Sequence, residues 1–499
     1  MNNPNPDYDV VIVGAGNAAI CAALSAWELG ASVLVLEKAP SYHRGGNTYF
    51  TGGAIRCAFS GLSDLKILIP DMTLGEEDSI EVGEYSESQY YDDLMRITDG
   101  LADPQLSQAL VSKSFNTLKW LQELGIRFVP LYGRQSFKVG NKHKFWGGLF
   151  VEAVGGGKGL SDQLFRLLEE RGIHISYETK ALRLVTDSWG EVKGVVCLSP
   201  MGEKEIRANA VVLACGGFES NAEMRTRYLG PGWDLAKVRG VPYNTGDGIR
   251  MALEIGAQSY GHWSGCHAVA WDVNAPNYGD RKITDLYQKH SYPFGIIVNI
   301  NGDRFVDEGA DFRNYTYAKY GKEILFQPNR VAFQIFDNKV KHLLRDEYRI
   351  PQCTMVQGDT IEEVAEGFGI SAERLLKTVE QFNSSVQGGV FDPTKLDGKK
   401  TLGLTPPKSN WALPIETPPY LAYAVTCGIT FTFGGLRINE KGKVINTEGI
   451  PIPGLFAAGE MVGGLFYYNY PGGAGLSAGS VFGRLAGANA AQHMKPTHE

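Results

Sequence analysis

A continuous β-branched run followed by a glycine turn is the feature that most constrains the fold of this chain. Residues 9–13 read DVVIV, the apolar composition that a strand buried in a parallel sheet requires. The turn at 14–19, GAGNAA, leads into an alanine-rich amphipathic helix that we expect to end before Gly30. Residues 32–36 read as a second strand, which ends at Glu37. This strand–helix–strand unit predicts an α/β domain built on a parallel sheet.

The unit matches the fingerprint of dinucleotide binding. Gly14 permits the tight turn, Gly16 lets the backbone approach a pyrophosphate, and Ala19 still allows close packing of the helix on the strand. The N-terminus of the helix offers free N–H groups and a positive dipole end to the phosphates. Glu37 lies at the distance along the chain where a carboxylate accepts hydrogen bonds from a ribose diol.

The segment after Glu37 favours FAD over NAD. Residues 38–53 read KAPSYHRGGNTYFTGG, a glycine- and hydroxyl-rich stretch that has no role in a simple NAD dehydrogenase. It suits a cofactor that extends past the pyrophosphate to an isoalloxazine. A surface loop without a ligand is the alternative interpretation.

Two later stretches of the chain are also rich in glycine. A buried strand at 211–214 ends in CGG at 215–217, and the stretch 453–460 reads as a strand that ends in Gly–Glu. Glu460 is placed to bind ribityl hydroxyls, and a helix after the glycine loop 463–477 would aim its N-terminus at the flavin. The residues predicted to bind the cofactor are Gly14, Gly16, Asn17, Ala18, Glu37, Lys38, Gly45, Gly46, Asn47, Thr48, Thr51, Gly52, Gly53, Ala181, Cys215, Gly216, Gly217, Asp247, Glu460, Gly475, Leu476 and Ser477.

Between these motifs the amino-acid composition of the chain changes. From about Trp263 to Gly434 glycine motifs thin out and aromatic residues become dense. We therefore expect a discontinuous FAD-binding domain, 1–265 and 433–499, interrupted by a capping domain at 266–432. The predicted fold class is α/β with an α+β cap, that is, a Rossmann-like FAD-binding domain with an inserted substrate domain. The other predicted elements are helices at 159–170, 247–255, 361–382 and 480–493 and strands at 173–177, 181–186, 192–198, 205–210 and 295–299.

Composition argues against several classes of function. The formal net charge is −7, which lacks the basic surplus typical of nucleic-acid-binding proteins. No apolar run approaches the roughly 18 residues that span a bilayer, and residues 1–10 show no signal-peptide pattern. The seven cysteines include no CxxC pair, which argues against a disulfide framework or an iron–sulfur cluster, and we predict no metal site. These features predict a cytoplasmic enzyme, with peripheral membrane contact through a redox partner as the alternative.

Three segments carry a resemblance to a known family. They read RGGN at 44–47, DEGADFRNYTY at 307–317 and NYPGG at 469–473. Together with the motifs above, they resemble the FAD-dependent fumarate reductase/succinate dehydrogenase/3-ketosteroid dehydrogenase superfamily over nearly the whole chain. Within it, the chain is most similar to the tricarballylate dehydrogenases. The resemblance implies that the cap closes over the flavin and that substrate lies between the two domains.

The resemblance also implies how FAD is held and which cap residue handles the proton. Succinate dehydrogenases attach FAD through a histidine, and the matching position here is Gly46, which predicts non-covalent FAD. Fumarate reductases use an arginine shortly after an RF-x-x-E segment as a proton shuttle. That segment is 304–308 here, and Arg313 is the candidate. Because arginine, with a pKa above about 12, is a poor base, clamping a substrate carboxylate is the alternative role.

Two residues that bind dicarboxylates in the family pattern are missing from this chain. Fumarate reductases have His-His-Thr-Met-Gly-Gly where this chain has TFTFGG at 430–435, and Asn-Arg-Leu-Gly-Gly where it has NYPGG at 469–473. Tyr470 thus takes the place of a substrate-binding arginine. It is similar to the tyrosines with which ketosteroid dehydrogenases polarise a carbonyl or abstract a proton. These departures weaken fumarate and succinate as substrates.

Several other side chains are candidates for the site. His290 lies before the strand at 295–299, and a catalytic and a purely structural role are both open. Tyr315, Tyr317 and Tyr320 are predicted to serve packing. Substrate carboxylates would be bound by Arg313 and His290. The weaker candidates are His262 and His267 for the site and Lys144 and Arg281 for substrate carboxylates.

The predicted reaction introduces or reduces a C=C bond next to a carboxylate or carbonyl. Hydride moves to flavin N5 and a cap residue takes the proton. A polycarboxylate such as tricarballylate is the leading substrate. A ketosteroid dehydrogenase-like enzyme or ene-reductase for a less charged carbonyl compound is the first alternative, and an electron-relay flavoprotein subunit is the second. An external electron acceptor is predicted: quinone, oxygen or a separate redox protein.

Overall fold

The computed structural model describes residues 6–493, so Met1 to Asn5, half of the stretch examined for a signal peptide, lie outside the described residues. The predicted strand–helix–strand unit is present. β1 (Tyr8–Val13) pairs in parallel with β2 (Val33–Leu36), and α1 (Asn17–Glu28) connects them. Gly14, in the turn between β1 and α1, has a φ of +106°, in the left-handed region that favours glycine.

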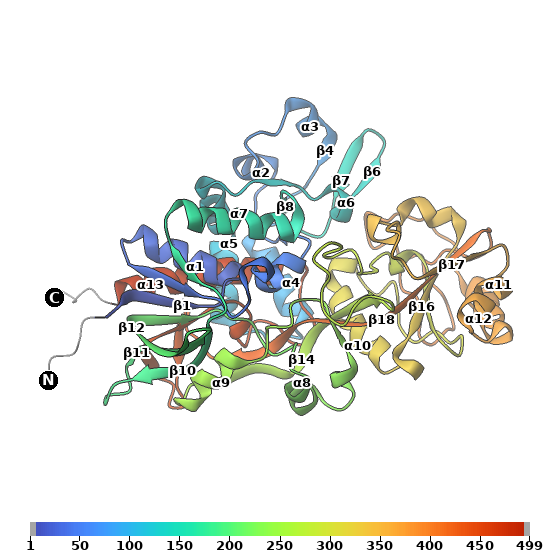
Figure 1. Cartoon of the computed structure of the whole chain (residues 1–499). Coiled ribbons are helices and arrows are strands. Elements are labelled where there is room, and N and C mark those ends of the chain that lie inside the picture. The colour runs from blue at the N-terminus through green and yellow to red at the C-terminus, as the bar shows by residue number, and fades with distance from the viewer. Residues whose placement is uncertain (1–5, 494–499) are drawn as a thin grey trace.

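An eight-stranded sheet forms the centre of the part that contains both chain ends, on the left in Figure 1. Its parallel strands are, in spatial order, β20 (Pro451–Ala457), β12 (Gly202–Leu213), β1, β2 and β9 (His174–Ser176). Antiparallel pairing adds β10 (Lys180–Thr186), β11 (Val192–Ser199) and β19 (Lys443–Ile445). The helices of this part include α1, α7 (Gly156–Glu170), α8 (Ala222–Leu229), α9 (Asp247–Glu254) and α13 (Ala474–Gln492). Because α13 packs on α1, the last helix of the chain lies beside the first glycine turn.

One predicted pair of strands is a single strand. We predicted separate strands at 205–210 and 211–214, but both belong to β12. The first half of β12 pairs with β11, and its second half enters the parallel sheet between β1 and β20. A strand that changes partners along its length reads in sequence as two strands, because the buried, continuous apolar composition begins only at the second half.

Three predicted helices have bounds that differ by more than one residue, the first being the helix predicted at 159–170, which is α7 and begins at Gly156. The helix predicted at 361–382 is divided into α11 (Ile361–Phe368) and α12 (Ala372–Ser385). Gly369, with a φ of +68°, ends α11 as a left-handed cap. The last helix, predicted from Ser480, begins at Ala474 after Gly473, whose φ is +83°. Its N-terminus therefore lies within the glycine loop that we predicted to precede it.

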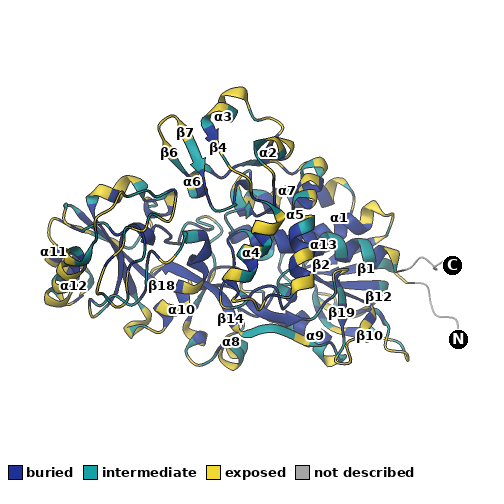
Figure 2. Ribbon diagram, turned by 180° about the vertical axis from the view of Figure 1, so that it is seen from behind, coloured by how far each residue is buried: buried dark blue, intermediate teal, exposed yellow. Residues whose placement is uncertain are grey.

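A second sheet of six strands is centred on β18 (Tyr420–Leu436), toward the right in Figure 1. Its other strands are β13 (Lys237–Val238), β14 (Ser259–Asp272), β15 (Ile296–Asn299), β16 (Ala332–Phe336) and β17 (Met355–Gly358). The helices α10 (Tyr317–Leu325), α11 and α12 belong to the same region. Its outer half has an apolar core of its own, which includes Ile296, Phe333, Val364 and Phe382. In Figure 2 the strands are mostly buried and exposed residues concentrate on the outer helices and loops.

Two long strands pass through the predicted boundaries of the cap, 265/266 and 432/433. β14 and β18 pair antiparallel from Ser259↔Leu436 to Asp272↔Val425, with register shifts after His262 and His267. The chain therefore passes between the two predicted domains as a paired ribbon rather than as two loops. The domain boundaries themselves stay a prediction.

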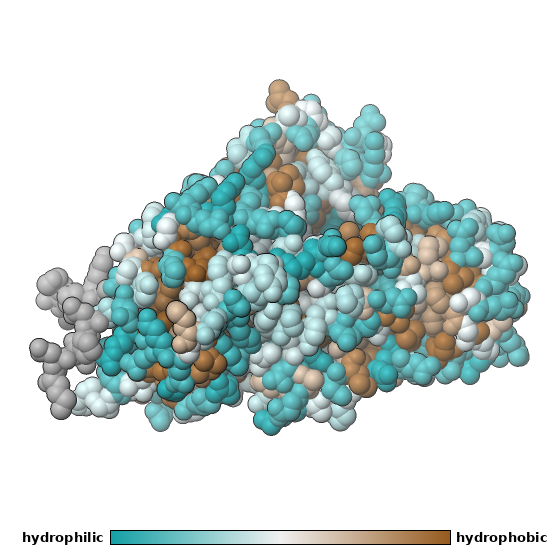
Figure 3. All heavy atoms as spheres, in the orientation of Figure 1, coloured by the Kyte–Doolittle hydropathy of each residue, from teal (hydrophilic) through white to brown (hydrophobic). Residues whose placement is uncertain are grey.

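The segment from β3 to β8 includes a projection at the top of Figure 1. Its helices are α2 (Leu62–Leu68), α3 (Leu74–Ser79), α4 (Glu87–Ile97), α5 (Pro104–Leu124) and α6 (Tyr132–Gln135). Its strands are β3 (Ala54–Ile55), β4 (Ile80–Glu81), β5 (Phe128–Pro130), β6 (Ser136–Val139), β7 (Lys142–Phe145) and β8 (Val151–Ala153). The projection is where α2, α3, α6, β4, β6 and β7 are labelled, whereas α4 and α5 lie lower in the body and α5 packs on α13. The face in Figure 3 is largely hydrophilic with scattered apolar groups. Within residues 6–493, no helix combines the length and the apolar composition that crossing a membrane requires.

Candidate active site

A cavity of ≈ 250 Å³ extends from the glycine turn after β1 to the cap strand β18. The predicted cofactor residues that line it are Gly14, Gly16, Asn17, Ala18, Glu37, Lys38, Gly46, Asn47, Thr48, Thr51, Gly52, Ala181, Cys215, Gly216, Asp247, Glu460, Gly475 and Leu476. Gly45, Gly53, Gly217 and Ser477 do not line it. Residues from opposite ends of the chain thus share one cavity.

The three glycines that do not line the cavity pack its wall. A Cβ at Gly45 would lie 2.4 Å from Ser161 Oγ, and one at Gly53 would lie 2.5 Å from the backbone of Gly156. A Cβ at Gly217 would lie 2.2 Å from Oε1 of Glu460. These positions need glycine because neighbouring groups approach too closely for a side chain.

The end of the cavity beside α1 has room for a phosphate group next to the backbone. A Cβ at Gly16 would meet Thr48 Oγ1 at 3.6 Å, and one at Gly46 would meet the Cα of Gly16 at 3.8 Å. The N–H of Asn17, at the start of α1, donates to Thr48 Oγ1 over 3.0 Å. A helix N-terminus beside two unobstructed glycines fits the pyrophosphate of FAD, which would be held by backbone N–H groups.

Polar contacts fix the second strand and its loop. Lys38 Nζ donates to Asp247 Oδ2 at 2.7 Å, which ties the end of β2 to the start of α9. The side-chain amide of Asn47 donates to Oε1 of Glu219 at 2.7 Å and to the Thr430 carbonyl at 2.8 Å. Its oxygen accepts from the N–H of Val241 at 2.9 Å. Asn47 therefore joins the loop after β2 to the cap strand β18, in addition to lining the cavity.

Glu460 and Glu219 form a carboxyl pair beside this loop, in which Glu219 is buried and Glu460 is half-buried. Each carboxyl group affects the pKa of the other, and Glu460 accepts from the N–H of Thr432 at 2.8 Å. Glu219 accepts from the side-chain amides of Asn47 and Asn244, the second at 2.6 Å. Burial, and then the charge of Glu219, raise the pKa of Glu460 well above its ordinary value. Glu460 therefore holds the proton that the pair retains, while the two amides stabilise the charge on Glu219.

Replacing Glu460 by glutamine should make the protein more resistant to rising pH. Because the pKa of Glu460 is raised by folding, its contribution is fully present below the ordinary value of 4.5 and is lost as pH rises toward the folded-state pKa. Glutamine keeps an N–H for Glu219 and an oxygen for Thr432 without titrating. The unfolding free energy of E460Q relative to the wild type should increase from pH 5 to pH 8 by up to about 1.4 kcal/mol per pH unit. Denaturant unfolding across this range measures it, with the exposed Glu448→Gln as control, and parallel pH profiles would contradict the assignment.

The cap end of the cavity is rich in arginine. Arg313, Arg239 and Arg134 line it. The buried carboxylate of Asp285 accepts from Arg239 Nε at 2.8 Å and from Arg134 Nη1 at 2.5 Å. Arg313 donates to the Arg134 carbonyl at 2.6 Å, and its Nε has no hydrogen-bond partner among residues 6–493. Burial lowers the pKa of Arg313, so its positive charge gains from an anionic ligand.

Aromatic and imidazole side chains line the same end of the cavity, where Arg313 lies over the Tyr317 ring at 5.8 Å. The hydroxyls of Tyr470 and Tyr317 are hydrogen-bonded to each other, and burial raises the pKa of both phenols. The His267 ring lies 4.7 Å from the Tyr470 ring, and the Phe431 ring lies 5.2 Å from it. Burial lowers the pKa of His267 well below its ordinary value, so that its imidazole is neutral. Tyr317, which we predicted to serve packing, thus lines the cavity with Tyr470.

The other predicted site residues lie elsewhere. His290 is buried with its ring 4.8 Å from the Tyr317 ring, but it does not line this cavity. His262 accepts from the N–H of Tyr468 at 3.0 Å, also outside the cavity. Lys144 pairs with Glu81 at 3.4 Å, and Arg281 stacks on Tyr49 at 3.5 Å. Arg239 and Arg134 occupy the place that we predicted for Lys144 and Arg281.

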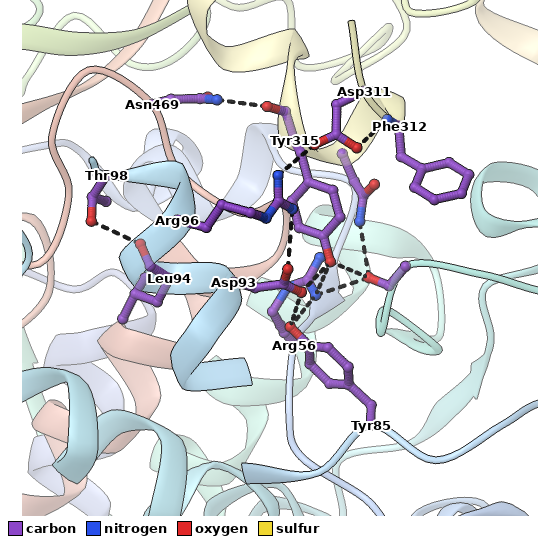
Figure 4. Close-up of polar contacts among 12 residues, drawn as sticks. Arg56, Tyr85, Asp93, Leu94, Arg96, Thr98, Asp311, Phe312, Tyr315 and Asn469 are labelled. Atoms are coloured by element: carbon purple, nitrogen blue, oxygen red, sulfur yellow. Dashed lines mark hydrogen bonds and ion pairs between the residues drawn. The ribbon is translucent and has the colours of Figure 1, made fainter. Parts of the chain in front are cut away.

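A buried network fixes the loop that carries Arg313. Figure 4 shows the guanidinium of Arg56 beside the hydroxyls of Tyr85 and Tyr315. Both hydroxyls donate to Asp93, Tyr315 at 2.5 Å and Tyr85 at 2.8 Å. Arg96, three residues after Asp93 on the same helix α4, donates to Asp311 at 2.7 Å. Residues 311–315 are therefore anchored on both sides of Arg313 to segments outside the cap.

Known proteins resemble this chain over nearly its full length. A family model described as an FAD binding domain matches residues 9–476. A probable fumarate reductase of Shewanella frigidimarina is 30% identical over 493 residues, covering 98% of this chain and 76% of the relative. A urocanate reductase of Eggerthella lenta is 30% identical over 516 residues, covering 97% and 75%. The solved structure of 3-ketosteroid-Δ4-(5α)-dehydrogenase from Rhodococcus jostii RHA1 is 26% identical with a TM-score of 0.71, covering 98% of both chains.

Proposed function

The chain belongs to the FAD binding domain family, within the fumarate reductase/succinate dehydrogenase flavoprotein superfamily, and on this basis we propose a reaction at a C=C bond. The protein introduces or reduces a C=C bond next to a carboxylate of a polycarboxylic acid. Its membership in the superfamily confirms the predicted fold class, FAD as cofactor, and an oxidoreductase that acts on C=C or CH–CH bonds. When bound, FAD supplies the acceptor or donor of two electrons. The tricarballylate-like substrate is the proposal.

The charge balance at the cap end of the cavity carries this proposal. Arg134 and Arg239 share the single carboxylate of Asp285, and Arg313 has no carboxylate partner within the described part of the chain. The buried Glu347 acts on both Arg134 and Arg313 without forming an ion pair with either. Burial raises the pKa of Glu152, beside Arg134, to about 7, so that the four guanidiniums of this region, with Arg345 as the fourth, still outnumber the ionised carboxylates. A cavity with surplus guanidinium charge favours a substrate that brings carboxylates.

The side chains that line this end fit the two tasks of the reaction. Arg313 would bind the carboxylate next to the reacting bond, which also raises the acidity of the adjacent C–H. The hydroxyls of Tyr470 and Tyr317 form a buried pair that can hold or relay the proton. His290, behind Tyr317, would act as a positioning residue for that ring.

The direct test is anaerobic addition of tricarballylate to the FAD-loaded protein. The absorption band of oxidised flavin should bleach with tricarballylate and not with butyrate, which lacks the additional carboxylates. Reoxidation by a quinone analogue, oxygen or a redox protein then identifies the predicted external acceptor. A protein whose flavin is reduced by no saturated polycarboxylate, and which when reduced converts no unsaturated one, would rule the proposal out.

A second candidate substrate class is favoured by one observation. Phe431 lies in the stretch 430–435, and Tyr470 in the stretch 469–473, where the resemblance places two carboxylate anchors of fumarate reductases, and the two rings are in aromatic contact. With Tyr317 they make a wall suited to an uncharged carbonyl compound, whose oxygen would accept from a phenol. A panel of enones and saturated ketones, tested in the same anaerobic assay, separates this candidate from the first. Cytoplasmic location and dissociable FAD stay predictions.

A further inference from the structure

The three arginines at the cap end of the large cavity differ in how many of their nitrogens are already bonded. All three side-chain nitrogens of Arg239 donate, Nε and Nη2 to Asp285 and Nη1 to Thr430 at 3.1 Å. Arg239 is therefore saturated, and its task is to hold Asp285 in place. Arg313 donates through Nη2, and its Nε is enclosed without a partner among residues 6–493. Its Nη1 alone is neither bonded to these residues nor enclosed by them.

Arg134 has the most free donors of the three. Its guanidinium uses Nη1 alone, which donates to Asp285 at 2.5 Å. Its Nε and Nη2 form no hydrogen bond with any of residues 6–493, and neither nitrogen is enclosed, since the side chain is 22% exposed and lines the cavity. Nε and Nη2 form one edge of the planar guanidinium, and such an edge matches the two oxygens of a carboxylate.

Asp285 fixes the orientation of Arg134 without neutralising it fully. Its Oδ2 accepts from Arg134 and, at 2.8 Å, from the side-chain amide of Gln288, while its Oδ1 accepts from Arg239. One carboxylate thus serves two guanidiniums. Burial lowers the pKa of Arg134, but the charges of Asp285 and Glu347 outweigh burial and raise it, so that the guanidinium stays charged.

The guanidinium of Arg134 lies beside the segment predicted to bind the flavin. A Cβ at Gly52 would lie 2.9 Å from Cζ of Arg134 and 3.3 Å from Oδ2 of Asp285, so glycine leaves the room that this ion pair needs. The Arg134 carbonyl accepts from Arg313 Nη2 at 2.6 Å, which holds the two arginines next to each other. Because Arg134 belongs to α6 and Arg313 to the loop before α10, a ligand bound by both would bridge two parts of the chain.

We propose that Arg134 is a specificity-determining residue, which binds a second substrate carboxylate, remote from the reacting bond, through its Nε–Nη2 edge. This role of Arg134 rests on the proposed function, in which Arg313 binds the carboxylate next to that bond. A polycarboxylate then engages both guanidiniums, and a monocarboxylate engages only one. Arg134 thereby supplies, from a different segment, a carboxylate contact that the stretches of Phe431 and Tyr470 do not offer.

Binding to the reduced protein isolates this contact from catalysis, because reduced flavin accepts no electrons from a saturated acid. Anaerobic isothermal titration calorimetry on FAD-loaded protein, reduced with stoichiometric dithionite, gives the Kd of tricarballylate and of butyrate, which has one carboxylate. Arg134→Gln should weaken tricarballylate binding about a hundredfold, the scale of a bidentate charge-assisted contact, and butyrate binding less than about twofold. Arg127→Gln, an exposed arginine that pairs with Asp71 at 2.7 Å, should change neither. An equal loss for both acids, or none for tricarballylate, would overturn the role of Arg134.

Steady-state kinetics give a second measure of the same contact. A group that binds a remote carboxylate holds substrate and transition state alike, so its removal raises KM and leaves kcat unchanged. Arg134→Gln should therefore raise the KM of tricarballylate about a hundredfold and change kcat less than about twofold. A fall in kcat without a change in KM would place Arg134 at the reacting bond and contradict the proposal.

A second variant keeps the test decisive if Arg134→Gln does not fold. Arg134→Lys keeps a charge beside Asp285 but lacks the planar edge, so tricarballylate affinity should fall about tenfold while butyrate affinity stays the same. Unchanged tricarballylate affinity in Arg134→Lys counts against the proposal. An altered midpoint potential of the flavin, together with unchanged tricarballylate affinity, would place the guanidinium against the cofactor and also refute it.

Flavin reduction separates a failure of this role from a failure of the proposed function. If tricarballylate reduces the flavin and Arg134→Gln binds tricarballylate as the wild type does, the proposed function stands and the role of Arg134 falls. If tricarballylate binding depends on Arg134 in a protein whose flavin no saturated polycarboxylate reduces and no unsaturated one reoxidises, the proposed function falls and the role of Arg134 in binding stands.

Discussion

Arg313→Gln should lower kcat/KM for the acid substrate by about a thousandfold, the scale of losing a positioned charge or proton-transfer group. Arg313 lines the cap end of the cavity without a carboxylate partner among residues 6–493. Glutamine still reaches the Arg134 carbonyl but brings no charge to the substrate. FAD content should stay that of the wild type, because the glycine turn of β1–α1 is not altered. Anaerobic stopped-flow reduction and the flavin spectrum measure the two quantities.

Two further variants define what Arg313 contributes. Arg313→Lys keeps the charge without the planar fork and should recover part of the activity. Arg374→Gln removes an arginine of the cap surface that pairs with Asp303, and it should change neither kcat nor KM. Flavin reduction by substrate at the wild-type rate in Arg313→Gln would favour the electron-relay interpretation, since a relay needs no substrate clamp.

Gly14→Ala should abolish stable FAD binding, with an affinity at least about a hundredfold weaker. The φ of +106° strains any side chain, which costs about 1–3 kcal/mol. A Cβ would also lie 2.4 Å from the Ala214 carbonyl oxygen and 2.8 Å from the Cα of Cys215. Relief of this clash must push β1 away from the end of β12, and both ends line the cavity. Since 1.4 kcal/mol is about tenfold in affinity, the two costs together suffice. FAD retained on gel filtration measures the effect.

Gly30→Ala is the matched control for this experiment. Gly30 belongs to the same strand–helix–strand unit and has a φ of +85°, but a Cβ there would meet nothing within 4 Å. It therefore carries the backbone strain without the clash at the cavity. Full FAD content in Gly30→Ala and loss in Gly14→Ala locates the effect at the turn. Full FAD content in both variants would mean that the turn tolerates a side chain and that the cofactor lies elsewhere.

Local patterns were sufficient to predict the nucleotide-binding unit. The run at 9–13, the turn at 14–19 and the strand that ends at Glu37 are contiguous, so that their spacing carries the geometry. Most glycines of the later loops could be assigned to the cavity for the same reason. The pattern could not distinguish a glycine that faces the ligand from a glycine that packs against the wall of the cavity. Gly16 and Gly45 look alike in sequence, but only the close approach of Ser161 makes Gly45 a packing residue.

The cap end of the site was predicted less well, because its residues come from unrelated places in the chain. Arg134 lies in α6, Arg239 follows β13, and Asp285 lies in a loop, with no spacing that links them. Only folding brings the two guanidiniums to one carboxylate. Lys144 and Arg281 were plausible by charge alone, which does not show which way a side chain points. A count of arginines in the loops beside the cap could have indicated a basic pocket, but not its members.

The pairing of β14 with β18 limits where the cap can be exchanged between related proteins. Since the two strands are bonded to each other on both sides of the 265/266 and 432/433 junctions, a graft inherits half of its pairing from each parent. A single-residue slip would turn every following side chain to the opposite face, including Phe431 and His267 at the substrate wall. Chimeras should therefore be spliced at paired positions, such as Ala268 with Ile429, so that both parents contribute matching halves.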